Sequence, residues 1–170
     1  MTLNIIDIAS SLMRSVNQTV FAMSEIALRE MPAVANEPVP FISIKGQRGT
    51  FLSIIHFSQK DKKWTKGVIV ITLLPEQIQK LFSKNHGIST GSTDADIMDV
   101  CGEFCNVVEG GFKKELLTLG FAEVMVEPPE SHFKEMSKKL ELMIHNKYQL
   151  TFNHQGVELL QAEMAMESPD

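Results

Sequence analysis

The chain has 170 residues, a length typical of one domain with enough apolar side chains to bury a single core. Its hydrophobic share of 44% and charged share of 22% are ordinary for a soluble globular protein, and its net charge of -5 argues against nucleic acid or an anionic membrane as the partner. The longest apolar run, 68–74, is far shorter than the roughly 20 residues that span a bilayer, and the N-terminus lacks the basic region of a signal peptide. These observations predict one cytoplasmic domain over residues 1–170.

The first predicted element is a long amphipathic helix. Asn4, with Asp7 three residues further on, is a plausible helix start, and apolar side chains then recur at helical spacing as far as Ala27. The helix is expected to stop before Pro32, because a residue that precedes proline disfavours helical backbone angles. The segment 36–40 is predicted to be a loop.

Three strands and a short helix are predicted next. The segments 41–45, 50–57 and 65–73 are rich in β-branched and aromatic residues, and turn-rich or polar residues separate them. Pro75 suits the first turn of a short helix. The apolar side chains of that helix that are expected to face inward are Ile78, Leu81 and Phe82.

A second long helix has clear start and stop signals. Thr93 followed by Asp96 resembles a capping box with Asp in place of the usual Glu, and Gly120 is a natural C-terminal cap. Its apolar side chains cluster within about 60° of one direction: Ile97, Cys101, Phe104, Cys105, Val108, Phe112 and Leu119. The spacing of the two cysteines matches neither a redox motif nor a zinc site, so both are predicted to lie in the core.

The remaining sequence is predicted to form strands. The segment 121–127 alternates like a strand until Pro128-Pro129, and apolar residues share one parity from Leu140 to Phe152. The tetrapeptide 153–156 then turns the chain into a return strand that ends near Met166. The order of elements predicts an α+β sandwich, in which two long helices cover one face of a largely antiparallel six-stranded sheet.

The polar face of the second long helix carries the candidate functional residues. Asp99, Glu103, Asn106, Gly110 and Lys113 fall within about 60° of one direction. Glu103 and Asn106 are three residues apart and project side by side, so that a carboxylate able to hold a cation adjoins a carboxamide able to orient a water molecule. Gly110 would allow another backbone to approach closely. On periodicity alone, a solvated face without function is the commoner explanation.

The acidic residues at the start of this helix allow a different hypothesis. Asp94, Asp96, Asp99 and Glu103 could belong to a metal-dependent hydrolase. Their spacing is not that of a calcium-binding EF hand, and the helix dipole alone favours acidic residues at a helix N-terminus. The metal hypothesis is therefore the weaker one.

The run from Asp99 to Leu116, DVCGEFCNVVEGGFKKEL, resembles the signature helix of the CheC/CheX/FliY phosphatase family, in its CheX form. The family pattern of Asp or Ser, three residues, Glu, two residues, Asn and a Gly about four further on is met by Asp99, Glu103, Asn106 and Gly110. The segment 67–82 is also similar to a strand and a Pro-Glu-started helix of the family, and the terminal hairpin fits.

This resemblance implies a CheC-like fold and an enzyme that removes the phosphoryl group from the aspartyl-phosphate of a CheY-like response-regulator receiver domain. Glu103 would contact the receiver's lysine and Asn106 would orient the attacking water, while Asp99, Gly110 and Lys113 would bind the partner. The Mg²⁺ would belong to the receiver, so the chain would need no metal or cofactor of its own, and a homodimer is expected. The alternative is a CheX-like module in two-component signalling that binds without hydrolysis.

The first long helix carries a degenerate copy of the same motif. CheC-type members have one motif on each long helix, and the equivalent residues here would be Ser10, Arg14 and Asn17. Arginine stands where the family requires glutamate, and an arginine cannot bind a lysine ammonium. The resemblance therefore implies one active site, on the second long helix.

Overall fold

The computed structural model describes residues 3–37, 50–60, 65–133 and 147–167. Three helices lie in this part of the chain: α1 (Ile5–Ser24), α2 (Pro75–His86) and α3 (Asp94–Thr118). The strands are β1 (Ala33–Glu37), β2 (Phe51–Gln59), β3 (Thr65–Leu73), β4 (Val124–Val126), β5 (Glu130–Phe133), β6 (Lys147–His154) and β7 (Val157–Glu167).

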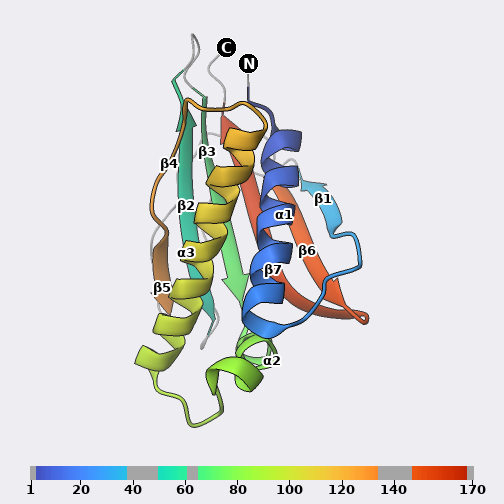
Figure 1. Ribbon diagram of the computed structural model, residues 1–170, viewed down its shortest axis with the longest axis vertical. Coiled ribbons are helices and arrows are strands. Elements are labelled where there is room, and N and C mark those ends of the chain that lie inside the picture. Colours follow the sequence, from blue (N-terminus) through green and yellow to red (C-terminus); the bar gives the residue numbers. More distant parts are fainter. Residues whose placement is uncertain (1–2, 38–49, 61–64, 134–146, 168–170) are drawn as a thin grey trace.

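All of these strands belong to one sheet in which every neighbouring pair is antiparallel. The order across the sheet is β1-β6-β7-β3-β2-β4, and β5 pairs with the same strand, β2, as β4 does. Figure 1 shows α1 and α3 side by side on one face of the sheet, running in opposite directions, with α2 at one end. The predicted α+β fold with two long helices on one face is confirmed, with seven strands in the described residues instead of six. None of the helices described is long and apolar enough to cross a membrane.

The strand predictions are correct in the centre of the sheet and incomplete at its edges. The predicted strand 65–73 has the bounds of β3. The predicted strand 50–57 begins one residue before β2 does and ends two residues before β2 does. The loop predicted at 36–40 is wrong for its first two residues, because β1 extends to Glu37 through pairing with β6. The strand predicted at 41–45 lies outside the described residues, as does the part of the hairpin before Lys147.

β4 and β5 correct the prediction of a single strand over 121–127. β4 covers only Val124–Val126, and β5 follows after Pro128-Pro129. The two strands pair with opposite halves of β2, β4 with 57–59 and β5 with 51–54. Because proline cannot donate a ladder hydrogen bond, the two prolines interrupt the pairing of this segment with β2, which resumes in β5.

The first helix ends earlier than predicted. α1 stops at Ser24, and Glu25 adopts a left-handed conformation with φ of 59°. The carbonyl of Met23 then accepts hydrogen bonds from Asn85 (3.4 Å) and His86 (3.1 Å) at the end of α2. The terminal carbonyls of a helix need such partners, so a contact with another helix, together with the bond from the Glu25 amide to the Phe21 carbonyl, stabilises this end of α1.

The hairpin between β6 and β7 confirms the predicted turn. Its two loop residues, Gln155 and Gly156, both have positive φ, 51° and 74°, as a type I′ turn requires. This turn fixes the register in which His154 faces Val157. Apolar residues of both strands thereby face the helices.

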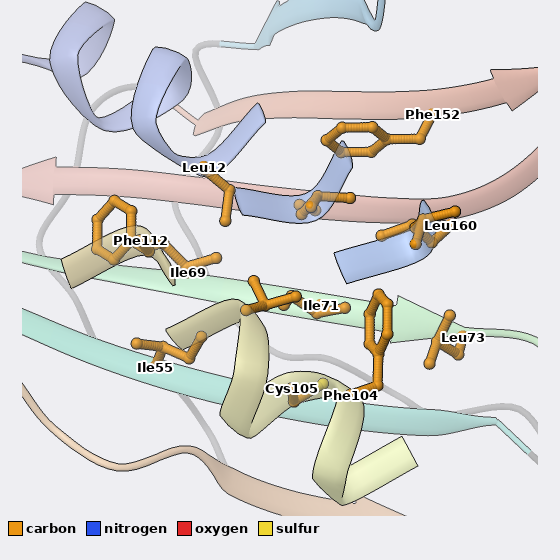
Figure 2. Close-up of a cluster of buried hydrophobic side chains, with 14 of the residues drawn as sticks. Leu12, Ile55, Ile69, Ile71, Leu73, Phe104, Cys105, Phe112, Phe152 and Leu160 are labelled. Atoms are coloured by element: carbon orange, nitrogen blue, oxygen red, sulfur yellow. The ribbon is translucent and has the colours of Figure 1, made fainter. Parts of the chain in front are cut away.

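The core lies between the helices and the sheet (Figure 2). Phe112 of α3 meets Phe57 of β2 edge to face, with ring centroids 6.1 Å apart, and Phe104 meets Phe82 of α2 in the same way at 5.7 Å. Other buried contributors are Leu12, Ile55, Ile69, Ile71, Leu73, Phe152 and Leu160. The core therefore buries the apolar side of α3, and the opposite side of this helix faces outward.

Candidate active site

Local hydrogen bonds determine both ends of α3. Thr93 accepts from the amide of Asp96 (3.1 Å), and the Asp96 carboxylate accepts from the amide of Thr93 (2.8 Å), which completes the predicted capping box. Hydrogen bonding of the Asp96 carboxylate to the backbone and the side chain of Thr93 holds its pKa below the usual value. At the other end Gly120, with φ of 95°, donates to the carbonyl of Leu117, and Phe121 donates to that of Leu116. The position of each side chain along the helix is therefore well determined.

The apolar side of α3 is buried as predicted, except that Ile97 and Leu119 near its two ends are half-buried. Buried side chains on this side are Cys101, Phe104, Cys105, Val108 and Phe112. Burial raises the pKa of the Cys105 thiol to about 12 and also raises the pKa of Cys101. Both cysteines are therefore core residues, as the sequence predicted.

The opposite side of α3 presents the predicted site residues to solvent. Asp99, Glu103, Asn106, Gly110 and Lys113 are all exposed. The helix brings them together in one stripe, with Glu103 and Asn106 adjacent at the spacing of one turn. No described atom outside the local backbone lies within 4 Å of the position that a Cβ on Gly110 would occupy. A partner can therefore reach the carboxylate, the carboxamide and the bare backbone from one direction.

Charge along this stripe changes sign from one end of α3 to the other. Asp99 and Glu103 lie in its first half, and Lys113 and Lys114 lie in its second half. Partial burial raises the pKa of Glu109, and the positive charge of Lys113 opposes that shift. The face is thus polarised along the helix axis, which favours one orientation of a charged partner.

The two neighbouring glycines of α3 have different surroundings. A Cβ on Gly111 would overlap the hydroxyl oxygen of Ser15 on α1 and lie 3.2 Å from the Ser15 Cβ. The Ser15 hydroxyl donates a buried hydrogen bond of 2.6 Å to the carbonyl of Val108. Gly111 therefore lets α1 and α3 approach closely, whereas Gly110 leaves the outward face open. Sequence reasoning did not separate these two roles.

A hollow of about 390 Å³ lies beside Glu103, where the end of α2 and the loop after it meet the first turns of α3. Its lining includes Asp99 and Glu103 together with His86, Ile88, Ser92 and Asp96. Sequence reasoning missed this hollow, because its walls come from segments whose proximity only the folded chain establishes. It gives a partner side chain space next to the Glu103 carboxylate.

The acidic residues of α3 are not grouped into a metal-binding arrangement with other described residues. Within the part of the chain that the structure describes, no group of three or more His, Cys, Asp or Glu side chains is placed to hold a metal ion. Asp96 instead completes the helix cap. The hypothesis of a metal-dependent hydrolase therefore gains no support from the geometry.

Comparison with known proteins identifies the family. Residues 52–152 match the family model described as chemotaxis phosphatase CheX, a match that includes all of α2 and α3. The chain belongs to the CheX family. No curated protein sequence matches it significantly.

Solved structures share the fold with this CheX-family chain. A CheC-like superfamily protein from Shewanella sp. PV-4 is 20% identical with a TM-score of 0.68, covering 97% of this chain and 99% of its own. The chemotaxis protein CheX from Vibrio vulnificus is 17% identical with a TM-score of 0.68, over 94% of this chain and 99% of that one. CheX in a complex with CheY, BeF₃ and Mg²⁺ from Borrelia burgdorferi is 16% identical with a TM-score of 0.60, over 95% and 97%.

The degenerate motif on α1 has a different environment from the motif on α3. Arg14, where the family motif has glutamate, forms an ion pair with Glu115 of α3 at 3.3 Å. The side-chain oxygen of Asn17 is buried, whereas Asn106 on α3 is exposed. In this CheX-family chain, therefore, α1 does not present an accessible carboxylate and carboxamide pair at these positions.

Proposed function

We propose that this chain is a phosphatase that hydrolyses the aspartyl-phosphate of a CheY-like receiver domain. The observation that carries the proposal is the exposed pair of Glu103 and Asn106 on the outward face of α3, next to the open backbone at Gly110. The family match and the structural similarity to a CheX that was solved in complex with CheY support it.

In this proposal the two side chains have separate roles. The Glu103 carboxylate accepts hydrogen bonds from the receiver's lysine ammonium and so positions the receiver over α3. The Asn106 carboxamide accepts from and donates to a water molecule and aligns it with the phosphorus atom. Phosphoryl transfer depends mainly on such positioning and on charge stabilisation, so one orienting side chain beside one docking carboxylate is sufficient machinery.

The remaining components come from the partner. The Mg²⁺ that neutralises the phosphoryl oxygens belongs to the receiver, and this chain contributes no metal ligand or cofactor. Asp99, Gly110 and Lys113 extend the contact surface along α3 on both sides of the reacting pair. The proposal also places the chain in the cytoplasm with its receiver, as a homodimer.

The test is the decay of phosphorylated receivers. A panel of receiver domains from the source organism is phosphorylated, and loss of phosphate is followed with and without this protein. We expect acceleration for at least one receiver, and a loss of roughly 100-fold or more in that acceleration for Glu103→Ala and for Asn106→Ala. Glu76→Ala is the matched control, because it removes an exposed carboxylate from α2 instead.

Two outcomes would contradict the proposal. If no receiver loses phosphate faster but one binds tightly, the chain is a binding module and Glu103 is a contact residue. If a receiver is dephosphorylated equally fast by wild type and by both α3 variants, the reaction takes place elsewhere on the protein.

A further inference from the structure

Phe21 on α1 is an exposed aromatic side chain on the same outward surface as the reacting pair. It is 57% exposed, although most large apolar side chains of α1 are buried. With about 100° per residue, Phe21 points directly away from Leu12, which faces the sheet. Phe21 therefore points outward from the helix layer.

The pairing of α1 with α3 places Phe21 level with the reacting pair. Ser15 contacts Val108 and Gly111, which fixes the register of the two antiparallel helices (Figure 1). At 1.5 Å per residue, Phe21 lies about 9 Å from Ser15 in the direction of the start of α3. Asn106 and Glu103 lie about 8 Å and about 12 Å from Gly111 in that same direction. Phe21 is thus level with the reacting pair, one helix spacing of about 8–10 Å away.

The size of a protein interface places Phe21 inside the footprint of the partner. A standard interface covers about 800 Å² on each partner, which corresponds to a disc of about 16 Å radius. A receiver centred on Glu103 and Asn106 would therefore extend across α1 at the level of Phe21. Val107, which adjoins Asn106 and is 45% exposed, extends the apolar surface between them.

We infer that Phe21 is the apolar anchor by which this chain docks the phosphorylated receiver, a role that rests on the proposed function. The receiver surface that it fits is an apolar patch adjoining the phosphoaspartate, with the receiver's lysine directed to the acidic half of α3. Buried aromatic anchors contribute a disproportionate share of binding energy, and the charge reversal from Glu103 to Lys113 fixes the orientation in which the anchor is engaged. Phe21 is a docking residue, since it does not touch the reacting atoms.

The experiment compares Phe21→Ala with Ile6→Ala in the receiver dephosphorylation assay. Ile6 is a matched control, because it is 71% exposed on the same helix but lies about 20 Å or more from the reacting pair, outside the footprint. We expect Phe21→Ala to raise KM for the phosphorylated receiver about tenfold with kcat unchanged, and Ile6→Ala to change neither. Receiver affinity, measured by fluorescence anisotropy, should fall by the same factor for Phe21→Ala.

The outcomes separate this inference from the proposed function. If wild type dephosphorylates a receiver and Phe21→Ala has the same KM as Ile6→Ala, the anchor is overturned and the phosphatase stands. If wild type binds a receiver without hydrolysis and Phe21→Ala weakens that binding, the anchor is supported and the phosphatase fails. If Phe21→Ala converts a dimer to a monomer in sedimentation without changing KM, Phe21 belongs to a contact between copies of the chain and the anchor is overturned. If wild type engages no receiver, both are overturned.

Discussion

The adjacent glycines of α3 lead to opposite predictions for the same substitution. Glycine in a helix interior costs about 1 kcal/mol relative to alanine. At Gly110 the new methyl group meets open space in the described structure, so Gly110→Ala should raise the free energy of unfolding by about 1 kcal/mol. The same increase in the free energy of unfolding is expected at Gly111, but there the contact with Ser15 opposes it.

The cost at Gly111 follows from its contact with Ser15. The added Cβ would overlap the Ser15 hydroxyl, which cannot rotate away without losing its hydrogen bond to Val108, worth about 1 kcal/mol. The Ser15 Cβ, 3.2 Å from the new atom, is also closer than ordinary van der Waals contact, so the helices must shift apart slightly, and overpacking of this kind costs about 1–3 kcal/mol. After the helical gain, Gly111→Ala should lower the free energy of unfolding by about 1–3 kcal/mol.

Urea denaturation followed by circular dichroism measures both variants against wild type. The two alanine variants should differ by about 2–4 kcal/mol. In the double variant Ser15→Ala/Gly111→Ala the overlap with the hydroxyl is removed, so its destabilisation should be smaller than the sum of the single effects. Equal stability of Gly110→Ala and Gly111→Ala would refute the assignment of Gly111 to the helix contact.

Two further predictions concern the cysteines and the degenerate motif. Iodoacetamide at about pH 8 should leave Cys101 and Cys105 unmodified in the folded protein and alkylate both in urea. The reason is that burial raises the pKa of both thiols, that of Cys105 to about 12. Mass spectrometry counts the modifications, and rapid alkylation of the folded protein would contradict the burial of these cysteines. Arg14→Glu should lower the free energy of unfolding by about 1 kcal/mol, because it removes the ion pair with Glu115, whose side chain is only 17% exposed, and puts a second carboxylate in its place. It should create no second active site, because the side-chain oxygen of Asn17 stays buried. A receiver assay in a background without the α3 pair tests this, and restored activity would show that α1 retains a usable site.

The elements that could be predicted from sequence are those with strong local signals. The capping box at Thr93 and the glycine at 120 predicted α3, the β-branched residues of 65–73 predicted β3, and the alternation of apolar residues predicted the hairpin around Gly156. In each case the signal lies within the segment itself. It is a cap or turn formed by residues near one another in sequence, or a composition or hydrophobic period that the whole element carries.

The elements that could not be predicted depend on partners distant in the chain. α1 ends at Ser24 where residues at the end of α2 hydrogen-bond to its last turn, although apolar periodicity continues to Ala27. β1 has a short, mixed sequence and is a strand because β6 pairs with it. β5 follows two prolines and is a strand because the first half of β2 has an edge available. None of these partnerships leaves a signal within the segment itself.

The two sides of α3 show why a buried face can be derived from sequence periodicity while a functional face cannot. Burial restricts Phe104 and Phe112 to large apolar residues, and that restriction repeats with the helical period. Glu103 and Asn106 are exposed, so the fold places almost no constraint on them, and it was the resemblance to a family motif that distinguished them from a solvated surface. Phe21 lies on a helix whose own motif is degenerate, where neither periodicity nor motif points to it. Its place level with Glu103 and Asn106 follows only from the antiparallel contact through Ser15 and Gly111, so the glycine that packs the helices also determines which residue of α1 lies beside that pair.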